Sequence, residues 1–231
     1  MRNILLSNRK MAVEENRKRL RHIISTVEFC GCQELPLRGH RDYGTFSFDQ
    51  PEDNDGVFRA ALRLRLQAAD KETRDLFENA PRNASYVSWR VQNDIIDCMA
   101  KQIQGQIVND VSSCKYFTIL ADETTDISQT EQLSLSLCFL KNDSIHEEFL
   151  CFVPVHSTTG DSLAETIIKQ LSQLGLDLKY LRGQGYDGAS NMSGKHRGVQ
   201  ARVREIYPLA MYTQTSILEP PLYKSGVRLL R

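Results

Sequence analysis

The sequence predicts an α/β protein in which a helical N-terminal region precedes a mixed β-sheet. Up to residue 111 apolar side chains recur every three or four positions, which is the period of an amphipathic helix. Beyond residue 112 the patterns follow the order strand, strand, strand, helix, strand. Because crossovers between parallel strands are right-handed, we expect the fourth strand beside the first and parallel to it.

The composition is that of a globular protein without a membrane segment. Of 231 residues, 41% are hydrophobic and 25% are charged, which suffices for one core. No apolar run approaches the roughly 18 residues of a membrane span. Six cysteines without framework spacing indicate reduced thiols, so we expect a nuclear or cytoplasmic protein. The formal net charge is zero, and basic residues gather only near the N-terminus and after residue 194.

Helices are predicted throughout the first half of the chain. The apolar pattern gives one helix over residues 14–29, a second over 57–76 and a third from Val87 to Ile107, with Trp89 in the core of the last. Four potential zinc ligands lie near the end of the first helix: His22, Cys30, Cys32 and His40. A zinc site is not favoured, because Cys-x-Cys lacks the usual spacer of two to four residues.

The second half of the chain alternates strands with helices. A continuous apolar run at 116–121 is typical of a strand buried on both faces, and leucines alternating with serines predict the next strand. The remaining elements are a turn at Asn142-Asp143, a strand at 148–155, a helix capped by Asp161 or Ser162 and ended by Gly175, a strand at 178–186 and a helix at 199–206.

Two acids follow neighbouring predicted strands. Asp122 comes directly after the first strand, and Asp187 follows the fourth within a glycine-rich loop, residues 185–194. Carboxylates brought this close repel each other unless a cation neutralises them, and Mg²⁺ prefers such oxygen ligands. The pair predicts a metal site for phosphoryl chemistry, in which a third acid normally holds a second ion. Asp126 is a rival ligand, and both positions also suit ordinary turn aspartates.

Two nucleotide-binding motifs match the glycine loop only superficially. Gly183-x-Gly185-x-x-Gly188 has the dinucleotide spacing, but the loop carries its own acid, Asp187, and the acid further on, Glu205, falls in a predicted surface helix. The stretch from Gly188 to Lys195 has five residues between its glycines, where a phosphate-binding loop needs four. Neither fold is predicted.

The chain also resembles a known family over residues 11–213. It is similar to hAT-superfamily transposases and, more narrowly, to transposon-derived zinc finger MYM-type protein 1-like proteins. The matching stretches are Leu120-Ala121-Asp122-Glu123-Thr124-Thr125-Asp126-Ile127-Ser128 with Glu131-Gln132-Leu133-Ser134, Glu15-Asn16-Arg17 with residues 29–42, the segment 181–194, and Gly198-Val199-Gln200-Ala201.

The resemblance implies an RNase H-like fold, here an incomplete one. It implies that Asp122 and Asp187 are the first two acids of the family's Asp-Asp-Glu triad, which binds Mg²⁺ during DNA cleavage and strand transfer. The family's third acid lies beyond a helical insertion, and this chain stops before it. The expected division is a disordered or extended N-terminus at 1–13, a helical region at 14–111, a truncated catalytic domain at 112–213 and an aberrant, disordered tail at 214–231.

Two functions follow from these observations. The first is a fragment derived from a Mg²⁺-dependent DNA cleavage and strand-transfer enzyme, inactive alone, with Mg²⁺ or Mn²⁺ held weakly or not at all. The second is a domesticated, non-catalytic module that binds DNA or protein. Whether the chain is an enzyme stays open. DNA and proteins, a second copy included, are the expected partners, whereas a membrane or a small-molecule substrate is not expected.

Overall fold

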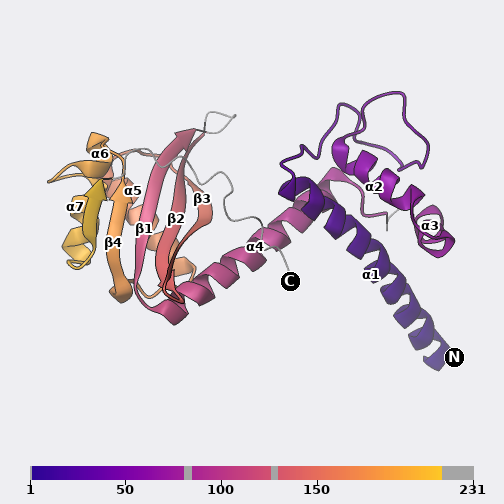
Figure 1. Ribbon diagram of the computed structural model, residues 1–231, viewed down its shortest axis with the longest axis horizontal. Coiled ribbons are helices and arrows are strands. Elements are labelled where there is room, and N and C mark those ends of the chain that lie inside the picture. The colour runs from indigo at the N-terminus through magenta and orange to yellow at the C-terminus, as the bar shows by residue number, and fades with distance from the viewer. Residues whose placement is uncertain (1, 81–84, 126–129, 215–231) are drawn as a thin grey trace. The chain divides into compact units, whose positions relative to one another are not determined.

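The structure, a computed structural model, describes residues 2–80, 85–125 and 130–214 (Figure 1), with backbone alone for residues 2–8. It forms two compact units, one within residues 2–100 and one that begins at Lys101. Asp126 and the tail from residue 215 onward lie outside the described residues. Each unit is described by itself below.

The first unit is helical, as expected. It contains α1 (Arg2–Cys32), α2 (Val57–Gln67), α3 (Lys71–Glu78) and the first turns of α4 (Trp89–Cys114). The first 13 residues were expected to be disordered or extended, but α1 begins at Arg2. The helix predicted over 57–76 is broken, because Asp70 caps a new helix by accepting a hydrogen bond from the Thr73 amide at 2.7 Å.

Two buried arginines organise the long connection between α1 and α2. Arg59 donates to the carbonyl oxygens of Tyr43 and Gly44 at 3.2 and 2.9 Å. Arg63 pairs with Asp55 at 2.6 Å. Both arginines are at most 4% exposed, so their hydrogen bonds satisfy charges that would otherwise be costly to bury. They also give an irregular segment a defined path beside the unit's apolar core, which contains Ile23, Val27, Phe58, Leu62, Leu66, Val87 and Ile95.

Trp89 is not a core residue. It is the first residue of α4 and is 47% exposed, with the Arg90 guanidinium 5.1 Å from the centre of its ring. Trp89 lies two residues after Val87 and so falls outside the four-residue repeat in which Val87 and Ile95 are buried. The prediction for Trp89 was therefore wrong.

The second unit is built on a five-stranded mixed sheet of order β3-β2-β1-β4-β5, which confirms the predicted fold class. Figure 1 shows β4, β1, β2 and β3 side by side in that order. The antiparallel strands are β1 (Phe117–Thr125), β2 (Glu131–Lys141) and β3 (Ser144–Pro154); β4 (Leu181–Tyr186) and β5 (Met211–Gln214) are parallel to β1. The sequence did not predict β5.

The connections follow the predicted turn chemistry with one exception. Asn142 and Asp143 take φ values of 51° and 59°, as a tight hairpin turn requires. Gly175 has φ 86° just after α5 (Gly160–Gln173), as predicted for a helix end. The cap of α5 is Thr159, which accepts from the Ser162 amide at 3.4 Å, and not Asp161 or Ser162. A short turn of 3₁₀-helix (Leu178–Tyr180) precedes β4.

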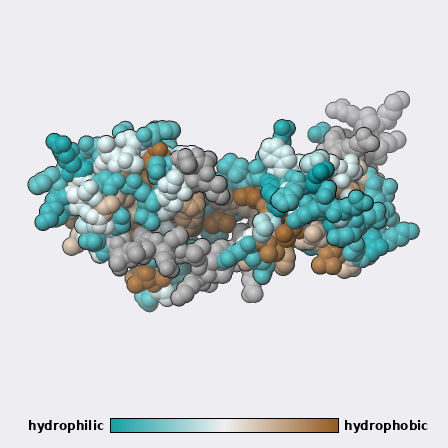
Figure 2. Space-filling model, turned by 90° about the horizontal axis from the view of Figure 1, so that it is seen from above, coloured by the Kyte–Doolittle hydropathy of each residue, from teal (hydrophilic) through white to brown (hydrophobic). Residues whose placement is uncertain are grey.

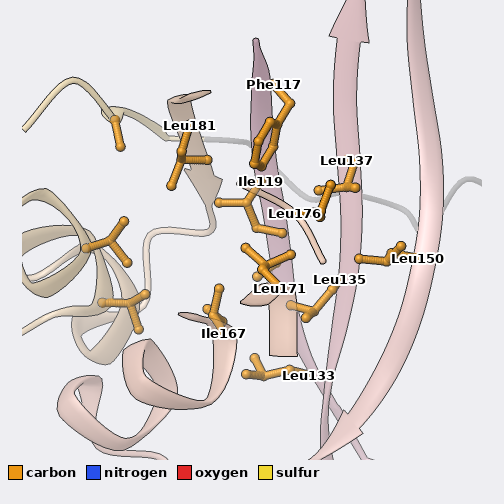
Figure 3. Packing of buried hydrophobic residues seen from close by; sticks show 14 of the residues in the cluster. Phe117, Ile119, Leu133, Leu135, Leu137, Leu150, Ile167, Leu171, Leu176 and Leu181 are labelled. Atoms are coloured by element: carbon orange, nitrogen blue, oxygen red, sulfur yellow. The ribbon is translucent and has the colours of Figure 1, made fainter. Parts of the chain in front are cut away.

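The core lies between one face of the sheet and the helices. Figure 3 shows Leu133, Leu135 and Leu137 pointing from β2 toward Ile167 and Leu171 of α5. The same cluster includes side chains from α7 (Val199–Ile206) and from the C-terminal part of α4. Each fully buried leucine contributes about 1.5–3 kcal/mol of transfer free energy. Alternation then leaves the other residues of each strand, among them Ser134 and Ser136, on the opposite face.

The molecular surface visible in Figure 2 is mainly hydrophilic, with small separate hydrophobic areas. Among the described residues no helix combines the length and the apolar character needed to cross a membrane.

Candidate metal centre

The strand register brings Asp122 and Asp187 together. In the parallel pairing of β1 with β4, Leu120 lies opposite Gly185. Asp122 lies two residues beyond Leu120 on β1, and Asp187 lies two residues beyond Gly185, directly after β4 ends at Tyr186. A continued register would place the two acids opposite each other, and the charge of Asp187 does act on Asp122. Neighbouring strands are about 4.8 Å apart, so two facing carboxylates are close enough to share one cation. Phe117, Ile119 and Ala121 belong to the core, so alternation places Asp122 on the opposite face of the sheet.

The residues beside the two acids on this face of the sheet have small side chains or none. Asp122 pairs with Ser134 of β2. On β4, a Cβ at Gly183 would lie only 2.4 Å from the hydroxyl oxygen of Thr118, so the strand accepts no side chain there. Gly185 follows two residues later on the same face. Gly183 therefore lets β4 lie close against Thr118 of β1.

The loop after β4 fixes the position of Asp187. Its Oδ1 accepts a hydrogen bond from the Ala189 amide at 3.2 Å, and its carbonyl oxygen accepts from the Tyr212 hydroxyl at 3.3 Å. A short helix, α6 (Ser190–Ser193), follows, and Ser193 Oγ donates to the Gly188 carbonyl at 3.0 Å. Since Tyr212 belongs to β5, the strand missed in the sequence supports the candidate site directly.

A third acid, Glu123, lies next to the pair and was not singled out by the sequence. It follows Asp122 on β1 and accepts a hydrogen bond from Asn191 Nδ2. The same nitrogen donates to the Thr158 carbonyl at 3.2 Å. The only signal in the sequence was that two acids stand side by side where the predicted strand ended.

The electrostatics of these acids reflect burial and mutual repulsion. Partial burial raises the pKa of Asp122, the charge of Asp187 raises it further, and a hydrogen bond from the Glu123 backbone opposes the shift. Burial also raises the pKa of Glu123, with smaller contributions from Asp187, Glu131 and Asp122, while its hydrogen bond with Asn191 acts the other way. A bound cation would relieve both effects.

The donor set suits a weakly held Mg²⁺ or Mn²⁺. Mg²⁺ is usually bound through one or two carboxylates and keeps several waters, which is what Asp122 and Asp187 can offer. In the part of the chain that the structure describes, no three or more His, Cys, Asp or Glu side chains converge on one metal position. The zinc set His22, Cys30, Cys32 and His40 is therefore not assembled, and all six cysteines are free thiols. The rival ligand Asp126 falls in a segment without a described position.

Basic residues follow the glycine loop in a tight turn. The Gly198 amide donates to the Gly194 carbonyl at 3.0 Å, and the turn exposes Lys195, His196 and Arg197. Arg202, another basic residue after position 194, is paired with Asp161 and, at 3.2 Å, with Glu205. The ion pairs of Arg202 therefore make the net positive charge of this region smaller than the sequence suggests.

A mixed sheet of this strand order, with helices on its core face and acids near the C-terminal ends of the adjacent strands β1 and β4, is consistent with an RNase-like α/β domain. The sequence profile of the ZMYM1/FAM200 RNase-like domain family (DUF4371) matches residues 1–198, and the chain belongs to this family. Two curated relatives are the human and mouse proteins named 52 kDa repressor of the inhibitor of the protein kinase. Each is 28% identical over 209 residues, which is 88% of this chain but 26% of the relative.

Proposed function

We propose that this chain is a transposase-derived, RNase H-like domain of hAT type in which Asp122 and Asp187 hold one Mg²⁺ or Mn²⁺ ion. The observation that carries the proposal is the β1–β4 register, in which Leu120 pairs with Gly185, so that Asp122 and Asp187 each lie two residues beyond one paired position. The raised pKa of Asp122, caused by burial and by the Asp187 charge, supports it, because a metal ion would compensate that repulsion.

The arrangement of these acids limits which reactions the site could support. Phosphoryl transfer with two ions needs ligands that clamp both the attacking and the leaving oxygen. Among the described residues, no group of three or more potential ligands converges on one metal position. Asp122 and Asp187 are the two candidate ligands, and Glu123 accepts a hydrogen bond from Asn191 instead. The proposal is therefore metal binding without strand transfer by this chain alone. Metal binding without turnover also fits a regulatory role, which is how the name of the relatives describes those proteins.

Calorimetric titration with Mn²⁺ tests the site. Wild type should bind one ion weakly, and Asp122→Asn, Asp187→Asn and the double variant should each lose that binding. Asp143→Asn is the matched control, since Asp143 is an exposed acid in a hairpin turn whose positive φ asparagine tolerates. Equal binding by the double variant would refute the site. Mg²⁺-dependent nicking of plasmid DNA that Asp187→Asn abolishes would refute the proposal that this chain alone does not cleave DNA.

A second candidate, non-catalytic nucleic-acid binding in the nucleus, has one specific observation in its favour. The turn between Gly194 and Gly198 exposes Lys195, His196 and Arg197 together. Fluorescence anisotropy with a DNA duplex in EDTA would test it without any metal. Replacing Lys195 and Arg197 by alanine should weaken binding and reduce the salt slope by about 0.9 for each phosphate that the variant no longer neutralises. An unchanged slope would exclude this turn as the DNA-binding surface.

A further inference from the structure

Asn191 joins three separate segments around the candidate metal centre. Its side-chain amide donates to Glu123 Oε1 on β1 and, at 3.2 Å, to the carbonyl of Thr158 just before α5. Asn191 itself belongs to α6, which follows the Asp187 loop. One amide group therefore connects the end of β1, the start of α5 and the loop that carries Asp187.

The backbone of Asn191 is fixed as closely as its side chain. A Cβ at Gly160, the first residue of α5, would lie 2.9 Å from the Asn191 carbonyl oxygen and 2.1 Å from that of Arg197. Only a glycine allows α6 and the following turn to lie this close to α5. Because main chain and side chain are anchored separately, the orientation of Asn191 is determined and not just its distance from β1.

A short hydrogen-bonded segment connects Asn191 to Asp187. Ser193 Oγ donates to the carbonyl of Gly188, and the Ala189 amide donates to Asp187 Oδ1. A displacement of α6 would therefore move the Asp187 carboxylate. Further restraints on this segment are the Gln200 side-chain amide, which donates to the carbonyls of Ser193 and Gly194, and the Tyr212 hydroxyl, which holds the main chain of Asp187 and not its carboxylate.

Glu123 and Asp122 lie on opposite faces of β1 and have different roles. Adjacent strand residues point to opposite faces of the sheet. Asp122 therefore lies on the face opposite the core, where the proposed metal would bind, while Glu123 lies toward α6. A metal ligand at position 123 would need its negative charge. An acceptor for Asn191 needs only an oxygen, which the amide of glutamine also provides.

We propose that Asn191 and Glu123 form a latch of positioning residues that holds the Asp187 loop against β1 and so keeps the Asp122 and Asp187 carboxylates opposed. The latch deepens the proposed metal site and rests on it. Hydrogen bonds made directly to a metal ligand typically change metal affinity by about 10–100-fold when they are removed, and the latch acts on Asp187 through α6 and Ala189, so we expect a loss at the lower end of that range.

The test compares Mn²⁺ affinity among Glu123→Gln, Glu123→Ala, Asn191→Ala and the double variant Glu123→Ala/Asn191→Ala. Removing either side of the latch should weaken Mn²⁺ binding about 10-fold, and the double variant should lose no more than either single variant. Glu123→Gln should bind Mn²⁺ more tightly than Glu123→Ala, because it loses the charge but keeps the acceptor for Asn191. Asn109→Ala is the control, an exposed asparagine on α4. Thermal unfolding of each variant verifies that it is folded.

Three results would overturn the latch: Glu123→Gln as weak as Glu123→Ala, additive losses in the double variant, or no loss in Asn191→Ala. If wild type itself binds no Mn²⁺, the proposed metal site fails, and the latch is then tested by hydrogen exchange at the amide of Ala189. Asn191→Ala should speed that exchange while Glu123→Gln and Asn109→Ala leave it unchanged. Unchanged exchange in Asn191→Ala would refute the latch as well.

Discussion

Asp122 and Asp187 each lie two residues beyond one paired position of the parallel strands β1 and β4, Leu120 with Gly185, and the charge of Asp187 acts on Asp122. Their proximity is a consequence of topology, since a right-handed crossover through α5 returns the chain to the strand beside β1. Burial and the neighbouring charge then raise the pKa of Asp122. The fold thus creates a local charge repulsion that has no structural benefit of its own.

This repulsion predicts the pH dependence of an Asp122→Asn variant. A carboxyl whose pKa is raised in the folded state stabilises that state below its unfolded pKa, near the ordinary value of 3.8, and this contribution is lost as the pH rises through the folded pKa. At pH 7 in EDTA, Asp122→Asn should therefore melt at or above the wild-type temperature. The difference should shrink as the pH falls toward 4. Differential scanning calorimetry measures both, with Asp143→Asn as the exposed control.

The same melting temperatures can be measured in the presence of Mn²⁺. An ion that binds only the folded state raises the melting temperature. Mn²⁺ should therefore stabilise wild type and Asp143→Asn but not Asp122→Asn. A variant less stable than wild type at pH 7, in a protein that unfolds reversibly, would contradict the repulsion on which this prediction rests.

The close approach of β4 to β1 predicts a coupling between Gly183 and Thr118. A Cβ at Gly183 would meet the Thr118 hydroxyl oxygen at 2.4 Å and its methyl carbon at 2.9 Å. Gly183→Ala should destabilise the protein by about 1–3 kcal/mol, as overpacking typically does. Thr118→Ala removes both atoms, so the double variant should recover part of the loss, with a coupling of about 0.5–3 kcal/mol in urea unfolding. Simple additivity of the two single variants would contradict the close approach.

Apolar patterning predicted most of the sheet, and topology predicted the acid pair. Leu133, Leu135 and Leu137 alternate with serines because only one face of β2 meets the helices, and this asymmetry is visible in the sequence. The place of Asp187 beside β1 followed from the handedness of crossovers. Both inferences depend on rules that act through the whole fold.

Features that depend on particular tertiary contacts were not predictable. The strand β5 is short and largely exposed, and its approach to β4 is guided by buried Gln184, whose side-chain amide donates to the Ala210 carbonyl at 2.9 Å. Glu123 was missed because β1 continues beyond its apolar run as far as Thr125. Its partner Asn191 lies in a different part of the sequence, where no periodic pattern connects the two residues.

The core of the second unit predicts a sharp contrast between two leucines of β2. Leu135 is fully buried among the helices and strands, whereas Leu140 is 58% exposed. Leu135→Ala should cost about 2–5 kcal/mol, because it forfeits transfer free energy and leaves a residual cavity. Leu140→Ala should change the free energy of unfolding by less than about 0.5 kcal/mol. Equal effects in urea denaturation would show that the helices do not pack on the face that carries Leu135.

Gly160 and Gly105 predict opposite effects for the same substitution. Both are helical glycines, one at the start of α5 and the other within α4. An alanine Cβ at position 160 would overlap the Arg197 carbonyl at 2.1 Å, whereas nothing lies within 4 Å of a Cβ at position 105. Gly160→Ala should therefore destabilise the protein by about 1–3 kcal/mol and displace α6. Gly105→Ala should stabilise it by about 0.4–1 kcal/mol, because it restricts the unfolded chain.

Denaturant unfolding separates these two outcomes, and Mn²⁺ titration connects the first one to the site. If the packing of α6 against α5 positions Asp187, Gly160→Ala should weaken Mn²⁺ binding even under conditions where the variant is fully folded. Gly105→Ala should bind Mn²⁺ as wild type does, since it lies on a helix that takes no part in the loop. A Gly160→Ala protein with lower stability but unchanged Mn²⁺ affinity would show that α6 can shift without moving the carboxylate. The position of Asp187 would then depend on contacts other than the packing of α6 against α5, among them the pairing of β4 and the Tyr212 hydrogen bond.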